Sequence, residues 1–87
     1  MLTVEMYTTA FCPFCSRAKN LLKQKDVPFT EIGVDRDPAL RQQMMERSGG
    51  GRTVPQIFID GESIGGSDEL VALESSGELD RLLRQTG

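Results

Sequence analysis

Two cysteines separated by two residues stand where a strand-like pattern changes into a helix-like one. Residues 2–7 alternate apolar and polar side chains, which predicts a strand. From Pro13 to Leu22 apolar residues recur at helical spacing, and proline suits a first helical turn because its missing N–H costs nothing there. The sequence therefore predicts a strand, a short connection and a helix with Cys12 at its start and Cys15 one turn in.

The rest of the chain also alternates strand-like and helix-like segments. An early strand–helix–strand unit implies a parallel pair of strands, and Asp60-Gly61 is a strong hairpin signal that implies an antiparallel pair. We therefore predict an α/β fold with a four-stranded mixed sheet and helices on both faces. Strands are expected at residues 2–7, 29–34, 54–59 and 63–64. One helix starts at Pro13 and is stopped by Asp26-Val27-Pro28, and a second starts at Pro38, is capped by Asp37 and ends at Ser48. Two short helices follow, the first with a cap at Ser67-Asp68-Glu69, and Ser75-Ser76-Gly77 separates them.

Composition narrows the class of protein further. The 87 residues fit one domain, residues 1–87. The absence of histidine excludes Ser-His-Asp and Cys-His catalytic pairs, and two cysteines are too few for a four-cysteine metal site in one chain. A net charge of −3 gives no general attraction to nucleic acid, and the apolar runs are too short to cross a membrane. The N-terminus does not read as a signal peptide, so we expect a cytoplasmic protein whose cysteine pair is catalytic.

The two cysteines hold different places on the expected helix. Cys12 stands at its start, where free N–H groups and the positive end of the helix stabilise a thiolate, whereas Cys15 is one turn further in and more buried. Cysteines at such helix starts have pKa values of about 3.5–7.5, against about 8.5 for a free thiol. We expect Cys12 to attack a disulfide and Cys15 to resolve the mixed disulfide. Two inert buried thiols, or a soft-metal carrier, are the alternatives.

Two further segments are candidates to lie beside this helix start and bind a substrate there. A cis bond after Val54 in Thr53-Val54-Pro55 would leave the Val54 backbone free to pair with an extended peptide, although the same residues also suit a plain strand boundary. In Gly65-Gly66-Ser67-Asp68, the N–H groups of a helix start suit a carboxylate and the Asp68 carboxylate suits an ammonium. A simple helix cap is the alternative interpretation.

These segments together resemble a dithiol glutaredoxin of the small bacterial type. The resemblance covers nearly the whole chain and is carried by Tyr7-Thr8 with Cys12-Pro13-Phe14-Cys15, by residues 52–59 and by residues 64–70. It implies a thioredoxin-like fold, a cis Val54-Pro55 bond and glutathione as co-substrate. Three positions depart from the pattern: Phe14 replaces a more usual tyrosine, Thr9 a frequent lysine, and Ser67 a frequent third cysteine.

The resemblance also implies how glutathione would be held. The backbone of Thr53 and Val54 would pair with its central cysteine, while Ser67 and Asp68 would hold the γ-glutamyl carboxylate and ammonium. The remaining residues implied for this site are Phe14, Pro55 and, for the glycyl carboxylate, Arg41 and Arg52, each of which could instead be a solvated surface charge.

The function implied is a glutathione-dependent thiol–disulfide oxidoreductase. Such a protein reduces protein–glutathione mixed disulfides and protein disulfides, and glutathione reductase serves it indirectly by reducing the glutathione disulfide produced. We expect a monomer that needs no metal and no nucleic acid or membrane partner. An electron donor reduced by thioredoxin reductase is one alternative. The other is a module that binds an iron–sulfur cluster or copper through Cys12.

Overall fold

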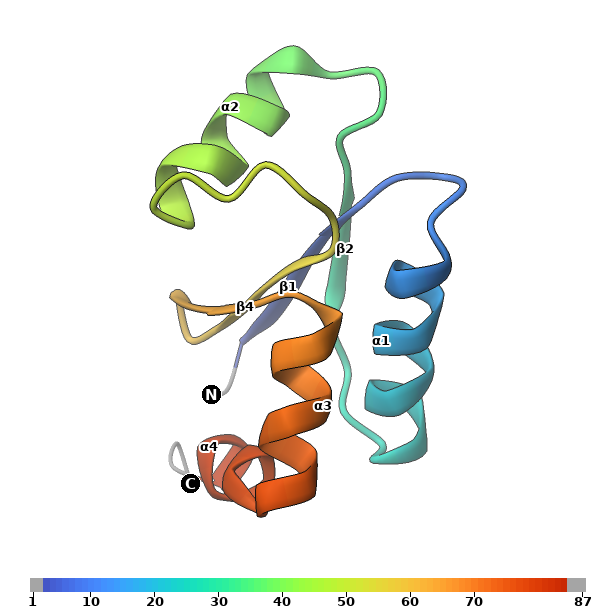
Figure 1. Cartoon of the computed structure of the whole chain (residues 1–87), viewed down its shortest axis with the longest axis vertical. Helices are drawn as coiled ribbons and strands as arrows, with labels where there is room; N and C mark the ends of the chain where they lie inside the picture. The colour runs from blue at the N-terminus through green and yellow to red at the C-terminus, as the bar shows by residue number, and fades with distance from the viewer. Residues whose placement is uncertain (1–2, 85–87) are drawn as a thin grey trace.

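The computed structural model describes residues 3–84 of the chain. Four strands and four helices follow one another along the sequence, and the predicted order of elements is confirmed (Figure 1). Their bounds are β1 Val4–Thr8, α1 Pro13–Gln24, β2 Thr30–Gly33, α2 Pro38–Arg47, β3 Gln56–Ile59, β4 Glu62–Gly65, α3 Ser67–Ser76 and α4 Glu78–Arg84.

The four strands form one mixed sheet in the order β2-β1-β3-β4. Strand β1 runs parallel to β2 and antiparallel to β3, and β3 runs antiparallel to β4. The β3–β4 hairpin turns at Asp60 and Gly61, whose φ angles of 52° and 81° suit the left-handed turn that an Asp-Gly pair favours. The parallel pair, the hairpin and the mixed sheet are all as predicted.

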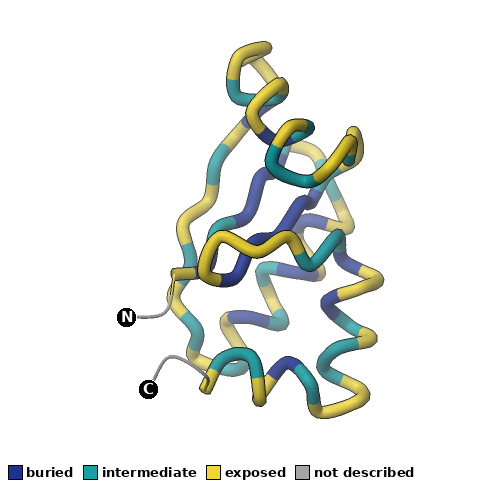
Figure 2. The backbone as a smooth tube through the Cα atoms, turned by 90° about the vertical axis from the view of Figure 1, so that its left-hand side faces the viewer, coloured by how far each residue is buried: buried dark blue, intermediate teal, exposed yellow. Residues whose placement is uncertain are grey.

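Alternation along the strands produces two buried layers, one on each face of the sheet, and the central strands are buried in both (Figure 2). Helices α1, α3 and α4 cover one face, and α2 covers the other. The first layer consists of Val4, Met6, Ala18, Leu22, Ile57, Ile59, Leu70 and Leu79. The second layer consists of Tyr7, Val34, Met44 and Phe58.

Local chemistry sets the starts of two helices. Pro13 is the first residue of α1, directly after the cap residue Cys12. Pro38 begins α2, and the carboxylate of its cap residue Asp37 accepts a hydrogen bond from the Leu40 N–H at 3.1 Å. At both starts the proline has no N–H that would need an acceptor, and the cap residue accepts a free amide N–H of the first turn.

Three expected boundaries need correction or fall outside the described residues. Strand β3 begins at Gln56 rather than Val54, because Pro55 has no N–H to donate to the ladder with β1. The cap of α3 is Gly66 rather than Ser67, and the Glu69 carboxylate accepts the Gly66 N–H at 2.7 Å. Leu2, the expected start of the first strand, lies outside the described residues.

Candidate active site

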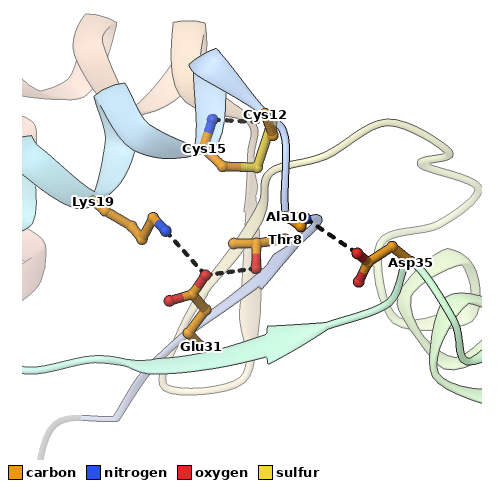
Figure 3. Close-up of polar contacts among 7 residues, drawn as sticks. All are labelled: Thr8, Ala10, Cys12, Cys15, Lys19, Glu31 and Asp35. Carbon is orange, nitrogen blue, oxygen red and sulfur yellow. Dashed lines mark hydrogen bonds and ion pairs between the residues drawn. A yellow bond between two sulfur atoms is a disulfide. The ribbon is translucent and has the colours of Figure 1, made fainter.

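The two cysteines lie at the start of α1 and form a disulfide there (Figure 3). Their Cα atoms are 5.1 Å apart, a separation that a disulfide spans without moving the backbone. Cys15 is fully buried, whereas Cys12 is only partly buried. The structure therefore confirms that the pair can bridge, and it leaves Cys12 as the more accessible sulfur.

The Cys12 sulfur occupies the cap position of α1. The Cys15 N–H donates to this sulfur at 3.1 Å, and the Cys12 carbonyl accepts the Ser16 N–H at 3.0 Å. Once the disulfide is reduced, the same amide and the positive helix end stabilise a thiolate at Cys12. The arrangement thus suits a sulfur that attacks disulfides and then returns to the bridged state.

A pocket of about 300 Å³ opens beside the cysteine pair. The Val54-Pro55 bond is cis, and the Val54 carbonyl oxygen, on the pocket wall, lies 3.7 Å from the Cys12 sulfur. Three separate segments, the first turn of α1, the loop before β3 and the start of α3, build the wall. Six of the residues expected to hold glutathione line it: Phe14, Thr53, Val54, Pro55, Ser67 and Asp68.

Ser67, which lines this wall, has a buried hydroxyl without a hydrogen-bond partner among the described residues. It is the first residue of α3 and only 4% exposed, and within residues 3–84 its Oγ is the one buried side-chain oxygen or nitrogen without a hydrogen-bond partner. Burying a hydroxyl without a partner costs about 1–3 kcal/mol. The N–H groups at the start of α3, where Ser67 lines the pocket, favour an anionic ligand there.

Asp68 already has a cationic neighbour. The Arg17 guanidinium lies 3.6 Å from the Asp68 carboxylate, and both side chains are largely exposed. No motif in the sequence marks Arg17 as a candidate site residue. The available signal was its position three residues after Phe14 on the same helix, which places both side chains on one face of α1.

The two arginines expected at the site are not part of the pocket wall. Arg41 donates from Nη1 to the carbonyl oxygen of Arg52 at 3.4 Å. This contact joins α2 to the loop that continues into Thr53, so Arg41 meets the residue just before the wall begins.

A second set of polar contacts supports the loop between β1 and α1 (Figure 3). The Glu31 carboxylate accepts hydrogen bonds from the Thr8 hydroxyl at 2.8 Å and from the Lys19 ammonium at 3.0 Å. These two contacts, the Thr8 hydroxyl first, lower the pKa of Glu31. The Asp35 carboxylate also accepts the Ala10 N–H at 3.3 Å. Sequence reasoning missed this set, because it depends on how β1, β2 and α1 meet.

Metal-ligand clusters and membrane-spanning helices are both absent from residues 3–84. Over residues 3–84, no group of three or more His, Cys, Asp or Glu side chains is placed to hold a metal ion. None of the helices in the described part of the chain combines the length and the apolar character that crossing a membrane requires.

The fold and the cysteine pair at the start of α1 define the class of protein: a thioredoxin-like fold with a redox-active dithiol. A family model described as glutaredoxin matches residues 4–64. The chain is 52% identical to glutaredoxin 3 of Escherichia coli strain K12 over 84 residues, which cover 97% of this chain and all of that protein. The chain belongs to the glutaredoxin family, whose members are thiol–disulfide oxidoreductases.

Two solved structures are similar over most of the chain. The solution structure of a glutaredoxin from Brucella melitensis has a TM-score of 0.85 and 48% identity, and the match covers all of this chain and 94% of the other. The crystal structure of a buckwheat glutaredoxin–glutathione complex also has a TM-score of 0.85, with 29% identity over 94% of this chain and 76% of the other.

Proposed function

We propose that this protein reduces protein–glutathione mixed disulfides with Cys12 as nucleophile, and that the pocket beside Cys12 holds glutathione. The observation that carries this proposal is the wall of the pocket, where Val54, whose carbonyl lies 3.7 Å from the Cys12 sulfur, comes together with Phe14, Ser67 and Asp68. The buckwheat relative, which was crystallised with glutathione, supports it.

In the first half of the reaction, the Cys12 thiolate attacks the glutathione sulfur of the mixed disulfide. A Cys12–glutathione disulfide forms, the original S–S bond breaks, and its electron pair leaves with the protein sulfur, which takes a proton from water. A second glutathione thiolate then attacks the glutathione sulfur held on Cys12. Glutathione disulfide is released and the Cys12 thiolate is restored. Reduction of that glutathione disulfide by glutathione reductase completes the cycle.

Protein disulfides follow a different route through the same cysteine. Cys12 attacks one sulfur of the substrate disulfide, and Cys15 then attacks Cys12 and releases the reduced protein. The product is the Cys12–Cys15 disulfide, the state that the structure displays. Two glutathione molecules reopen it and leave as glutathione disulfide.

The wall residues have separate proposed roles in holding glutathione. The Thr53 and Val54 backbone pairs with its central cysteine, and the Phe14 and Pro55 side chains border that residue. The Ser67 hydroxyl and the N–H groups at the start of α3 bind the γ-glutamyl carboxylate.

The proposed ionic contacts lie at either end of the bound tripeptide. The Asp68 carboxylate binds the ammonium and thereby exchanges part of its contact with Arg17. Arg41 and Arg52 provide positive charge toward the glycyl carboxylate. We propose that the protein acts as a monomer in a reducing compartment such as the cytosol, where these thiols are kept reduced.

The test is a coupled assay with glutathione, glutathione reductase and a glutathionylated peptide. Cys12→Ser should reduce turnover to the uncatalysed rate. Cys15→Ser should keep deglutathionylation but lose reduction of a protein disulfide, because only the second route needs the resolving thiol. Turnover that survives Cys12→Ser would contradict the proposed nucleophile.

Two further measurements test the electron donor and the thiolate. The same assay with thioredoxin reductase in place of glutathione and its reductase should give no turnover, and equal turnover would favour the alternative donor. The rate of Cys12 alkylation against pH should report a thiol pKa below about 8.5, the value for a free cysteine.

A further inference from the structure

Exposed aromatic rings flank the attacking sulfur. Within residues 3–84, two large hydrophobic side chains are exposed, Phe11 at 98% and Phe14 at 57%. They lie one residue before and two residues after Cys12. A single exposed apolar residue is ordinary in a folded protein. Here, however, both such residues are next to the same reactive side chain.

The two rings have different surroundings. Phe14 is on the first turn of α1 and lines the pocket beside Cys12. Phe11 belongs to the loop between β1 and α1, and it is not part of that pocket wall. A glutathione molecule in the pocket would therefore leave Phe11 uncovered and available to the other part of the substrate.

The geometry of the exchange decides which part reaches Phe11. When Cys12 attacks the glutathione sulfur, the new S–S bond forms as the old one breaks, and the electron pair goes to the leaving protein sulfur. Because the pocket holds the glutathione part, the protein part lies outside the pocket, against the surface that surrounds Cys12. Phe11, directly before Cys12 in the chain and almost fully exposed, belongs to that surface.

The chain segment around Phe11 and Cys12 carries no charged side chain. Residues 9–16 contain no Asp, Glu, Lys or Arg, in a chain of which 26% of the residues are charged. The Asp35 carboxylate accepts the Ala10 N–H, and the carboxylate of Asp68, which lines the pocket, is paired with Arg17. An apolar segment can thus cover Phe11 without removing water from a charged group of this loop.

We propose that Phe11 binds an apolar side chain next to the reacting cysteine of the protein substrate, so that this protein prefers mixed disulfides in an apolar sequence context. The inference rests on the proposed function, because it names the substrate class for the same reaction. Burial of an exposed aromatic ring stabilises the encounter with such substrates and contributes nothing with substrates that lack the side chain.

The test compares two glutathionylated peptides of equal length and net charge, one with leucine and one with serine on both sides of its cysteine. The wild-type protein should show a kcat/KM about tenfold higher for the leucine peptide. Phe11→Ser should bring the ratio of the two values close to one, and Phe11→Leu should keep most of the preference. Ala10→Ser, a change at the exposed neighbour in the same loop, is the matched control and should leave the ratio unchanged.

A third substrate separates this inference from the proposed function. The mixed disulfide of glutathione and 2-mercaptoethanol offers almost no surface to Phe11, so both the wild-type protein and Phe11→Ser should turn it over at similar rates. If the wild-type protein does not reduce it, the proposed function fails. If it does, but the two peptides react equally well or Phe11→Ser keeps the preference, the role of Phe11 alone is wrong.

Discussion

The two faces of the sheet are held by different kinds of interaction. On the face covered by α1, α3 and α4, every member of the buried layer is aliphatic or Met, and the contacts are non-directional. On the face covered by α2, the layer has half as many members, four against eight, and two of them are aromatic. The smaller layer leaves more of the attachment of α2 to directional contacts, whereas ion pairs of Lys25 with Glu74 and Asp80 add to the larger layer by joining the helices of the other face.

Arg47 supplies the directional contacts on the α2 face. Its guanidinium lies 4.2 Å from the centre of the Phe58 ring, binds the Glu5 carboxylate at 2.9 Å and donates to the Tyr7 hydroxyl at 2.8 Å. Its hydrogen bonds to Glu5 and, second, to Tyr7 raise the pKa of Arg47. The Tyr7 hydroxyl in turn donates to Gln43 at 2.6 Å, which ties a second side chain of α2 to the sheet.

The difference between the two faces affects the segments that build the candidate active site. The cysteines at the start of α1 and Ser67 at the start of α3 are carried by helices that pack on the larger, aliphatic layer. The loop that carries Thr53 follows α2 and is also held by Arg41. We therefore expect changes on the first face to reduce stability most, and changes on the second face to respond to salt.

The largest expected effect is the loss of a buried leucine from the first layer. Leu70→Ala removes a fully buried side chain of α3 and should lower the free energy of unfolding by about 3–4 kcal/mol, measured by urea denaturation. Met44→Ala, the matched change in the second layer, should cost about 2 kcal/mol, because the smaller layer gives Met44 fewer buried apolar neighbours to lose. A greater loss from Met44→Ala would reverse the comparison of the two faces.

An intermediate effect is expected at Arg47. Arg47→Gln removes the ion pair with Glu5 and the contact with the Phe58 ring, and it should cost about 1 kcal/mol, a modest value because both charged side chains are partly exposed. The cost should shrink as salt rises, since salt screens partly exposed charges. Denaturation in low and high salt measures it, with Leu70→Ala as the salt-insensitive control. A cost for Arg47→Gln that does not change with salt would show that packing, not charge, holds α2.

The smallest expected effect concerns pH and Glu31, whose carboxylate is hydrogen-bonded to Thr8 at the end of β1 and to Lys19 on α1. Its pKa is lowered in the folded protein by the Thr8 hydroxyl and the Lys19 ammonium. A lowered folded pKa means that the stabilisation is present above the unfolded value of about 4.3 and is lost as pH falls through the folded value. Glu31→Gln should therefore cost about 0.5 kcal/mol at pH 7, and this difference should disappear near pH 3. Urea denaturation of both proteins across this range measures it, and a difference that grows toward pH 3 would contradict the sign.

Much of the fold and part of the site follow from short stretches of sequence. Cys12 and Asp37 cap their helices because each side chain accepts an N–H of the first turn, which the proline after it begins. Asp60-Gly61 makes a hairpin because both residues tolerate positive φ. Local motifs predict Phe14, Val54 and Ser67 as candidate site residues, and all three line the pocket beside Cys12. Each of these features depends on neighbours only a few residues away.

Contacts between distant segments were decided by the tertiary structure alone. The pairing of Arg17 with Asp68, the contact of Arg41 with the Arg52 carbonyl and the bracing of Thr8 by Glu31 join residues 11 to 51 positions apart. Whether a side chain meets such a partner depends on how helices pack on the sheet and on strand register, and no local pattern encodes either. Short-range backbone chemistry thus determined where each element begins and which residues carry the sulfur chemistry. Packing across the sheet determined which charges and hydroxyls surround that sulfur.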